Sequence, residues 1–364
     1  MARFLLRRLV TSVVVLFGLG VVTFLMTQVL PGDPARAAAG RNATAEQVAA
    51  AASRLGLDRP LWDQFAAYFG RLFQGDLGTS VVTRRPVLDD IAQALPSSVE
   101  LVLAAMLINV AIAVPLGVYA AHRRGRFADV AARVIVLLGA AVPVFWLGLV
   151  LQLVFADRLG MLPLTGQLGF GREVPEITGM TSVDALLSGD LPAFGDAVSH
   201  LVLPALTLAA AFIAVVARTV RSSMITVLDS DYVTLARATG ASERRVVIRH
   251  GLRNALVPVS TIIGMQLGWM LGSTVLVESV FGRTGIGAYA VTAVLQNDLY
   301  AVIGTVLVIG VVFVLVNIVV DLVQLWLNPR LRQPARGAAP APAASLAPGA
   351  AAEAGPAVKE GAVS

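Results

Sequence analysis

Residues 99–121 read VELVLAAMLINVAIAVPLGVYAA, an apolar run in which Glu100 is the single charged residue. A helix needs about 20 consecutive apolar residues to cross the hydrocarbon core of a bilayer, and this run is long enough. Comparable runs occupy residues 9–30, 134–156, 200–217, 257–277 and 301–327. The 364 residues are 57% hydrophobic and only 14% charged, with a mean hydropathy of +0.78, which a soluble domain does not show. We therefore expect an all-α polytopic membrane protein with six transmembrane helices.

Arginine placement orients these spans. The net charge of +5 comes almost entirely from arginine, because Lys359 is the one lysine. Arginines gather before the first run, after the second, between the fourth and fifth, and after the sixth. By the positive-inside rule both termini then face the cytoplasm. The arginines form no basic stripe, so we do not expect nucleic acid as a partner. The expected surroundings are the lipid bilayer.

Four segments divide the chain. Residues 1–30 are the N-terminal cytoplasmic end and first span, and 31–98 an extracytoplasmic helical segment. We expect residues 99–332 to form a five-helix transmembrane core with a cytoplasmic loop at 218–256, and 333–364, rich in Ala, Pro and Gly, to be a disordered tail. A cleaved signal peptide is the alternative for the first run, but 9–30 is longer than the 7–15 apolar residues typical of a signal core.

Two helices are predicted within residues 31–98. Thr44 and Gln47 have capping-box spacing, so a helix begins there and ends at Gly56. A second helix begins at Pro60 and carries an apolar face made by Leu61, Phe65, Tyr68, Phe69 and Leu72. That face must rest either on the membrane surface or on the extracytoplasmic mouth of a channel.

No catalytic, cofactor-binding or metal-binding set is expected in this chain. Cysteine is absent and the three histidines lie far apart in sequence. A phosphate-loop ATPase needs a lysine in G-x-x-x-x-G-K-[ST], and the lysine of this chain lies in the tail. Glu100, Glu278 and Asp321 stand near span ends, where we expect water or lipid headgroups to reach them. Energy for any transport must therefore come from a partner.

Three glycines mark one face of the fifth span. Gly264, Gly268 and Gly272 are four residues apart, so they share a helix face and form a groove that another backbone can approach closely. Two interpretations stay open. The groove receives a neighbouring helix of this chain, or it meets a second membrane subunit across a translocation path.

The loop at 218–256 has a helix–glycine–helix pattern. Ser230 or Asp231 can cap a short helix that Gly240 terminates, and Ser242 with Glu243 can open the next. The structured turn indicates a docking surface for a soluble partner, with a solvated connector as the alternative. Its candidate residues are Leu235, Ala236, Arg237, Ala238, Thr239, Gly240, Ala241, Ser242, Glu243 and Arg244.

A set of short motifs follows in order along the chain. They are Leu30-Pro31-Gly32-Asp33-Pro34, Arg54-Leu55-Gly56-Leu57-Asp58-Arg59-Pro60, Gly75-Asp76-Leu77-Gly78-Thr79-Ser80, Pro143-Val144-Phe145-Trp146-Leu147-Gly148, His200-Leu201-Val202-Leu203-Pro204-Ala205, Asp231-Tyr232-Val233-Thr234-Leu235-Ala236-Arg237-Ala238-Thr239-Gly240, Glu278-Ser279-Val280-Phe281 and Asn328-Pro329-Arg330. In this order they resemble the permease subunits of dipeptide, oligopeptide and nickel ABC importers, over roughly residues 1–332. The first motif is typical of one of the two permease types in these importers.

The resemblance implies a type I ABC importer permease that forms half of a peptide path. Its implied partners are a second homologous permease, one or two cytoplasmic ATPase subunits that use the ATP, and an extracytoplasmic solute-binding protein. Nickel or oligosaccharide transport is an alternative, and a stand-alone secondary transporter is a third. The sequence departs from the family pattern at Thr284-Gly285-Ile286-Gly287 and at Asn297-Asp298, near the outer mouth.

Overall fold

A computed structural model describes residues 2–29, 35, 39–40, 43–125, 127, 134 and 142–327. Within these residues the chain is helical, and one isolated bridge, between Thr79 and Pro86, is its strand-like feature. Five helices are long and apolar enough to cross a membrane. They are α1 (Ala2–Val29), α5 (Val87–His122), α9 (Leu191–Leu228), α12 (Arg253–Phe281) and α14 (Leu299–Leu327).

The third expected span, 134–156, lies partly outside the described residues. Its described part forms α7 (Val144–Leu151), which continues into the π-helix η1 (Gln152–Arg158). The motif at residues 30–34 and the tail 333–364 also lie outside the described residues. The shorter helices are α3 (Ala45–Leu55), α4 (Leu61–Phe73), α8 (Thr181–Leu187), α10 (Asp231–Ala238), α11 (Glu243–Arg245), the π-helix η2 (Val246–Leu252) and α13 (Ile286–Leu295).

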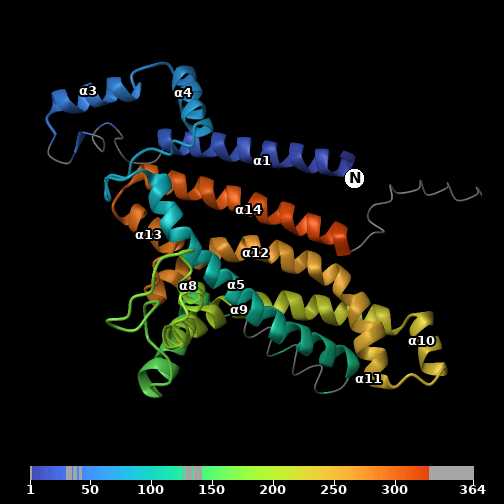
Figure 1. The fold of residues 1–364 in the computed structure, drawn as a ribbon. Coiled ribbons are helices and arrows are strands. Elements are labelled where there is room, and N and C mark those ends of the chain that lie inside the picture. The colour runs from blue at the N-terminus through green and yellow to red at the C-terminus, as the bar shows by residue number, and fades with distance from the viewer. Residues whose placement is uncertain are drawn as a thin grey trace, which may run out of the picture.

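The long helices run side by side and sort the short elements to the two ends of the bundle (Figure 1). The N-terminus, α10 and α11 lie at one end, and α3, α4, α8 and α13 lie at the other. The arginine-rich loop therefore shares an end with the start of α1. This is the arrangement that the predicted orientation requires.

The spans α5 and α9 exceed their predicted apolar runs by the most. The fourth was expected at 200–217, but α9 covers Leu191–Leu228, and α5 begins twelve residues before the expected 99. Asp190 fixes the start of α9 because its side chain accepts a hydrogen bond from the backbone N–H of Ala193 at 2.9 Å. Pro204 lies inside α9 without ending it, as prolines are tolerated within transmembrane helices.

The core of the bundle forms where α5, α9 and α12 meet. Leu101, Leu208 and Met270 come from these three helices and are buried together. α5 and α9 approach closely because Gly117 faces α9: a Cβ at Gly117 would lie 2.7 Å from the carbonyl oxygen of Ala217. Small residues at helix crossings serve this purpose in membranes.

The outer segment contains both predicted helices. The capping box of Thr44 and Gln47 is confirmed, and Gly56 ends α3 in the left-handed conformation with φ +69°. The apolar face of α4, however, packs on α1. The two predicted contacts were the membrane surface and the extracytoplasmic mouth of a channel. Phe65 packs edge-on against Phe24, with ring centroids 5.2 Å apart. α1 offers an aromatic surface at that height and covers the rings of α4, whereas Leu61 at the start of α4 stays 61% exposed.

Candidate functional site

The candidate coupling loop begins where α9 ends. The backbone of Ser230 is extended, as at a helix N-terminus, and α10 follows at Asp231. The predicted side-chain cap is wrong. The Ser230 hydroxyl donates to the carbonyl of Val227 at 2.5 Å, and its oxygen accepts no hydrogen bond from a backbone N–H of α10. Serine hydroxyls often return to a preceding carbonyl in this way, and here that bond ties α10 to the end of α9.

Gly240 turns the chain between the two helices of the loop. Its φ of +83° is left-handed, a conformation that costs a residue with a Cβ roughly 1–2 kcal/mol. The N–H of Ala241 donates to the carbonyl of Ala236 at 3.1 Å, which closes the end of α10. Among the described residues, its two chain neighbours aside, no atom lies within 4 Å of a Cβ placed on Gly240. The requirement for glycine is therefore one of backbone conformation and not of space.

The second helix of the loop continues into the membrane. Ser242 is extended at its N-terminus, without a side-chain cap, and α11 starts at Glu243 as predicted. α11, η2 and α12 follow one another without a break from Glu243 to Phe281. The π-helical turns of η2 place Gly251 against Met224 of α9. The turn at Gly240 is thus joined directly to the fifth span.

Buried and ionic contacts hold the loop against the bundle. Val233 of α10 and Val246 of η2 are fully buried in one cluster. Glu243 accepts hydrogen bonds from the Arg237 guanidinium at 3.1 and 3.3 Å, and its carboxylate lies 3.9 Å from the His122 ring at the end of α5. These contacts give the loop a defined shape.

The candidate coupling residues form the outward surface of this loop. The Leu235 side chain is 65% exposed, although it is large and apolar. Ala236 and Ala241 are partly buried. Residues 237–240 and 242–244, most of them polar, are exposed to solvent. The structure therefore brings the ten candidate residues of this loop together on one turn.

The glycine groove of α12 receives α14 along most of its length. A Cβ on Gly264 would overlap the side chain of Val320, and one on Gly268 would overlap the ring of Phe313. Gly272 differs, since it is exposed and a Cβ there would meet nothing within 4 Å. Two of the three glycines therefore pack against a helix of the same chain.

A cluster of polar and charged side chains lies at the outer end of α12. We call Ser98, Glu100, Glu278 and Arg283 the outer polar cluster. The Glu278 carboxylate accepts hydrogen bonds from the Ser98 hydroxyl at 2.5 Å and from the backbone N–H of Gly287 at 2.8 Å. Its partner amide belongs to the first turn of α13, where a negative charge is favoured by the helix dipole.

Arg283 and Glu100 form a buried ion pair beside it. Their side chains are 3.1 Å apart and are only 1% and 5% exposed. Burial lowers the pKa of Arg283, while the charges of Glu100 and Glu278 act in the opposite direction. The expectation that water reaches Glu100 and Glu278 was wrong, because both are buried: the first turn of α13 covers Glu278, and Ser182 of α8 and Arg283 bind Glu100. No sequence signal had indicated Arg283.

A second polar contact lies near the middle of the bundle. Asn109 of α5 donates to the side-chain oxygen of Gln266 of α12 at 2.9 Å, and both residues are buried. Gln266 donates in turn to the backbone carbonyl of Phe212 in α9 at 3.2 Å. These amides connect three spans, as interhelical hydrogen bonds do in membrane proteins. Neither residue stood out in the sequence, because a neutral amide does not interrupt an apolar run.

The comparisons with known proteins define the class. Residues 113–333 match the family described as the binding-protein-dependent transport system inner membrane component, and residues 1–102 match the N-terminal model of that membrane component. The chain belongs to this family. It is a permease subunit of a binding-protein-dependent transporter, and its place is the bacterial inner membrane, which it crosses several times.

Two relatives align along nearly their whole length. The chain is 42% identical to the probable D,D-dipeptide transport system permease protein DdpB of Escherichia coli strain K12, over 88% of this chain and 94% of that protein. It is 40% identical to the di/tripeptide transport system permease protein DppB of Pseudomonas aeruginosa strain UCBPP-PA14, over 91% and 99%. A solved inward-facing structure of the MetNI methionine ABC transporter is similar at 18% identity, with a TM-score of 0.49 over 65% of this chain and 96% of that one.

Proposed function

We propose that this chain forms half of the translocation path of an ABC importer for short peptides. The names of the two relatives refer to dipeptides and to di/tripeptides, and both align with most of this chain. The other half of the path belongs to a second homologous permease. An extracytoplasmic binding protein delivers the peptide to the end of the bundle that carries α13.

The chain supplies no ATPase site in this proposal. Its sequence lacks the phosphate-loop lysine, so one or two cytoplasmic ATPase subunits bind and hydrolyse the ATP. No cofactor belongs to this chain itself. The permease changes conformation and catalyses no reaction. ATP binding to the ATPase subunits shifts it between two conformational states.

The observation that carries the proposal is the exposed turn at Gly240 and its continuity with α12. The turn presents Leu235 outward at the end of the bundle where the N-terminus lies, which suits a cleft in a soluble subunit. A displacement of this turn passes into the unbroken helix from Glu243 to Phe281. At the other end Glu278 holds the first turn of α13. Movement of the ATPases is thereby coupled to the outer mouth.

Uptake by the reconstituted complex tests this function. The two permeases and the ATPases are reconstituted in proteoliposomes. ATP is enclosed in the lumen, the binding protein is added outside, and uptake of a labelled dipeptide is measured. We expect uptake that requires ATP and the binding protein. Uptake of a nickel chelate or an oligosaccharide in place of the peptide would support an alternative substrate. Uptake by this chain alone without ATP would identify a secondary transporter.

A further inference from the structure

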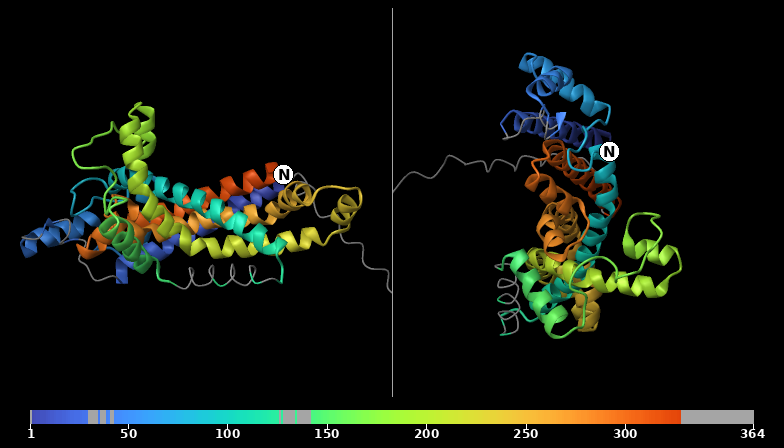
Figure 2. Two further views of the ribbon diagram at one scale, coloured as in Figure 1. Left: turned by 90° about the horizontal axis from the view of Figure 1, so that it is seen from below. Right: turned by 90° about the vertical axis from the view of Figure 1, so that its left-hand side faces the viewer.

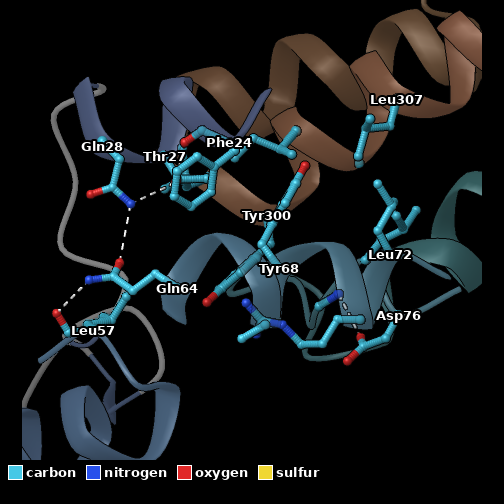
Figure 3. Close-up of a pocket in the computed structure, with 17 residues that line it drawn as sticks. Phe24, Thr27, Gln28, Leu57, Gln64, Tyr68, Leu72, Asp76, Tyr300 and Leu307 are labelled. Carbon is cyan, nitrogen blue, oxygen red and sulfur yellow. Dashed lines mark hydrogen bonds between the residues drawn. The ribbon is translucent and has the colours of Figure 1, made fainter. Parts of the chain in front are cut away.

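A cavity of about 240 Å³ lies between α1, α4 and α14, away from the coupling loop (Figure 3). Its inner wall is apolar, with Phe24 of α1, Leu72 of α4 and Leu307 of α14. Polar side chains stand around its mouth, among them Gln28 and Asp76. An apolar interior with a polar rim fits an amphipathic molecule.

The cavity extends from headgroup level into the hydrocarbon layer. Gln28 lies next to the end of the first span, and Leu299 begins the last one. Leu307 is two turns further along α14, about 12 Å deeper at about 1.5 Å per residue. A molecule in this cavity would therefore have its polar end at the membrane surface and its apolar end among the acyl chains.

The helix that covers the cavity has the character of an interfacial helix. α4 lies at the edge of the molecule beyond α1, as the right view of Figure 2 shows. Its outward side chains Trp62 and Phe73 are 80% and 85% exposed. Aromatic residues gather at the membrane–water interface, where the ring meets lipid and the helix remains partly hydrated. The surroundings of the cavity are thus lipid.

The rim of the cavity carries one cationic and one anionic side chain, Arg71 and Asp76. Arg71 lines the cavity and is partly exposed, and its guanidinium makes no hydrogen bond or ion pair with any described residue. Asp76 stands on the same rim and uses one carboxylate oxygen to accept from the N–H of Gly78 at 2.9 Å. Guanidinium groups bind phosphate oxygens through paired hydrogen bonds.

We propose that this cavity binds one phospholipid of the outer leaflet. Its phosphate lies at Arg71, and one acyl chain runs along Leu72 and Leu307 between α4 and α14. The second oxygen of Asp76 is placed for the ammonium of an ethanolamine headgroup. The lipid joins α4 to the bundle, so the outer segment is held partly by the membrane itself. This site is independent of the transported solute.

Photolabelling of the intact transporter tests the site. The complex is placed in nanodiscs that contain phosphatidylethanolamine with a diazirine in one acyl chain, and labelled peptides are mapped by mass spectrometry. We expect label on the cavity walls of α4 and α14. Arg71→Gln should reduce that label about tenfold, the effect of losing a charge-assisted hydrogen bond. Arg158→Gln, an exposed arginine of η1 that does not line the cavity, should leave the label unchanged.

A pair of adjacent alanines provides the steric control. Ala67 lines the cavity and Ala66 does not, although both are exposed on α4. Ala67→Phe fills the space and should reduce labelling of the cavity walls to background, whereas Ala66→Phe should not. Equal labelling in these two variants, together with equal labelling in Arg71→Gln and wild type, would overturn the proposal. So would cavity walls that crosslink to the partner permease instead of to lipid.

Discussion

The carboxylate of Glu278, near the outer end of α12, accepts a 2.8 Å hydrogen bond from the backbone N–H of Gly287 in the first turn of α13. A side chain at residue 287 would overlap the backbone of Val275, so only glycine allows this approach. The carboxylate thus serves as the N-terminal anion of a helix that follows it in the chain. Because α12 is continuous with α11, one helix connects this contact to the turn at Gly240.

The buried ion pair of the outer polar cluster should stabilise the folded transporter. Arg283→Gln leaves the buried Glu100 carboxylate without its cationic partner, although Ser182 still donates to it; loss of one partner costs about 3–5 kcal/mol in buried pairs. We expect a clear fall in the thermal unfolding temperature of the purified complex. Arg172→Gln is the control, because Arg172 is 46% exposed and its ion pair with Asp196 is long, at 3.9 Å. Equal shifts in the two variants would contradict the role of the buried pair.

The glycine groove predicts a difference between two leucine substitutions. Gly268→Leu must displace Phe313 of α14, and overpacking of this kind costs about 1–3 kcal/mol. We expect a lower yield of assembled complex and lower uptake. Gly272→Leu meets open space within this chain and should be tolerated. If Gly272→Leu impairs assembly and Gly268→Leu does not, the groove contacts a second subunit.

The ion pair across the coupling turn predicts a charge-swap rescue. Glu243→Arg replaces the partner of Arg237 with a like charge, which pushes α10 away from α11. An exposed pair contributes only about 0.2–1 kcal/mol, so we expect membrane insertion to persist while peptide uptake falls. The double variant Arg237→Glu with Glu243→Arg should recover most of the uptake. Failure of the swap would mean that Glu243 acts through the ATPase surface and not through Arg237.

Local signals in the sequence predicted the elements that depend on neighbouring residues. The capping box at Thr44, the end of α3 at Gly56 and the start of α11 at Glu243 follow from side chains a few positions apart. The ends of α9 could not be found from hydropathy, because tertiary packing extends a helix past its apolar run. Ser230 does stand at the N-cap of α10, but its hydroxyl donates to the carbonyl of Val227 and its oxygen accepts nothing from the first amides of α10, a choice that sequence spacing does not reveal.

The outer polar cluster could not be predicted from local sequence patterns, because its members are far apart in the chain. Ser98 and Glu278 are 180 positions apart, and Glu100 and Arg283 are 183 apart. Each carboxylate alone reads as a charge at a span end, open to water. Only the folded chain shows that α13 covers Glu278 and that Ser182 of α8 and Arg283 enclose Glu100. The docking role of residues Leu235–Arg244 stays a prediction, although the structure gathers these residues on one exposed turn.

Uptake by a Gly240→Val transporter tests the central claim that the turn at Gly240 couples ATP hydrolysis to the membrane helices. Valine at φ +83° strains the turn by roughly 1–2 kcal/mol, enough to shift a conformational equilibrium about tenfold. Gly240→Asn is the control, since asparagine adopts this conformation readily.

The measurement is dipeptide uptake beside ATP hydrolysis in proteoliposomes that contain the full complex. For Gly240→Val we predict normal insertion of the spans, continued hydrolysis and about tenfold less uptake, with Gly240→Asn close to wild type. A Gly240→Val complex that assembles and transports peptide like wild type would contradict the account, and the loop would then be only a connector.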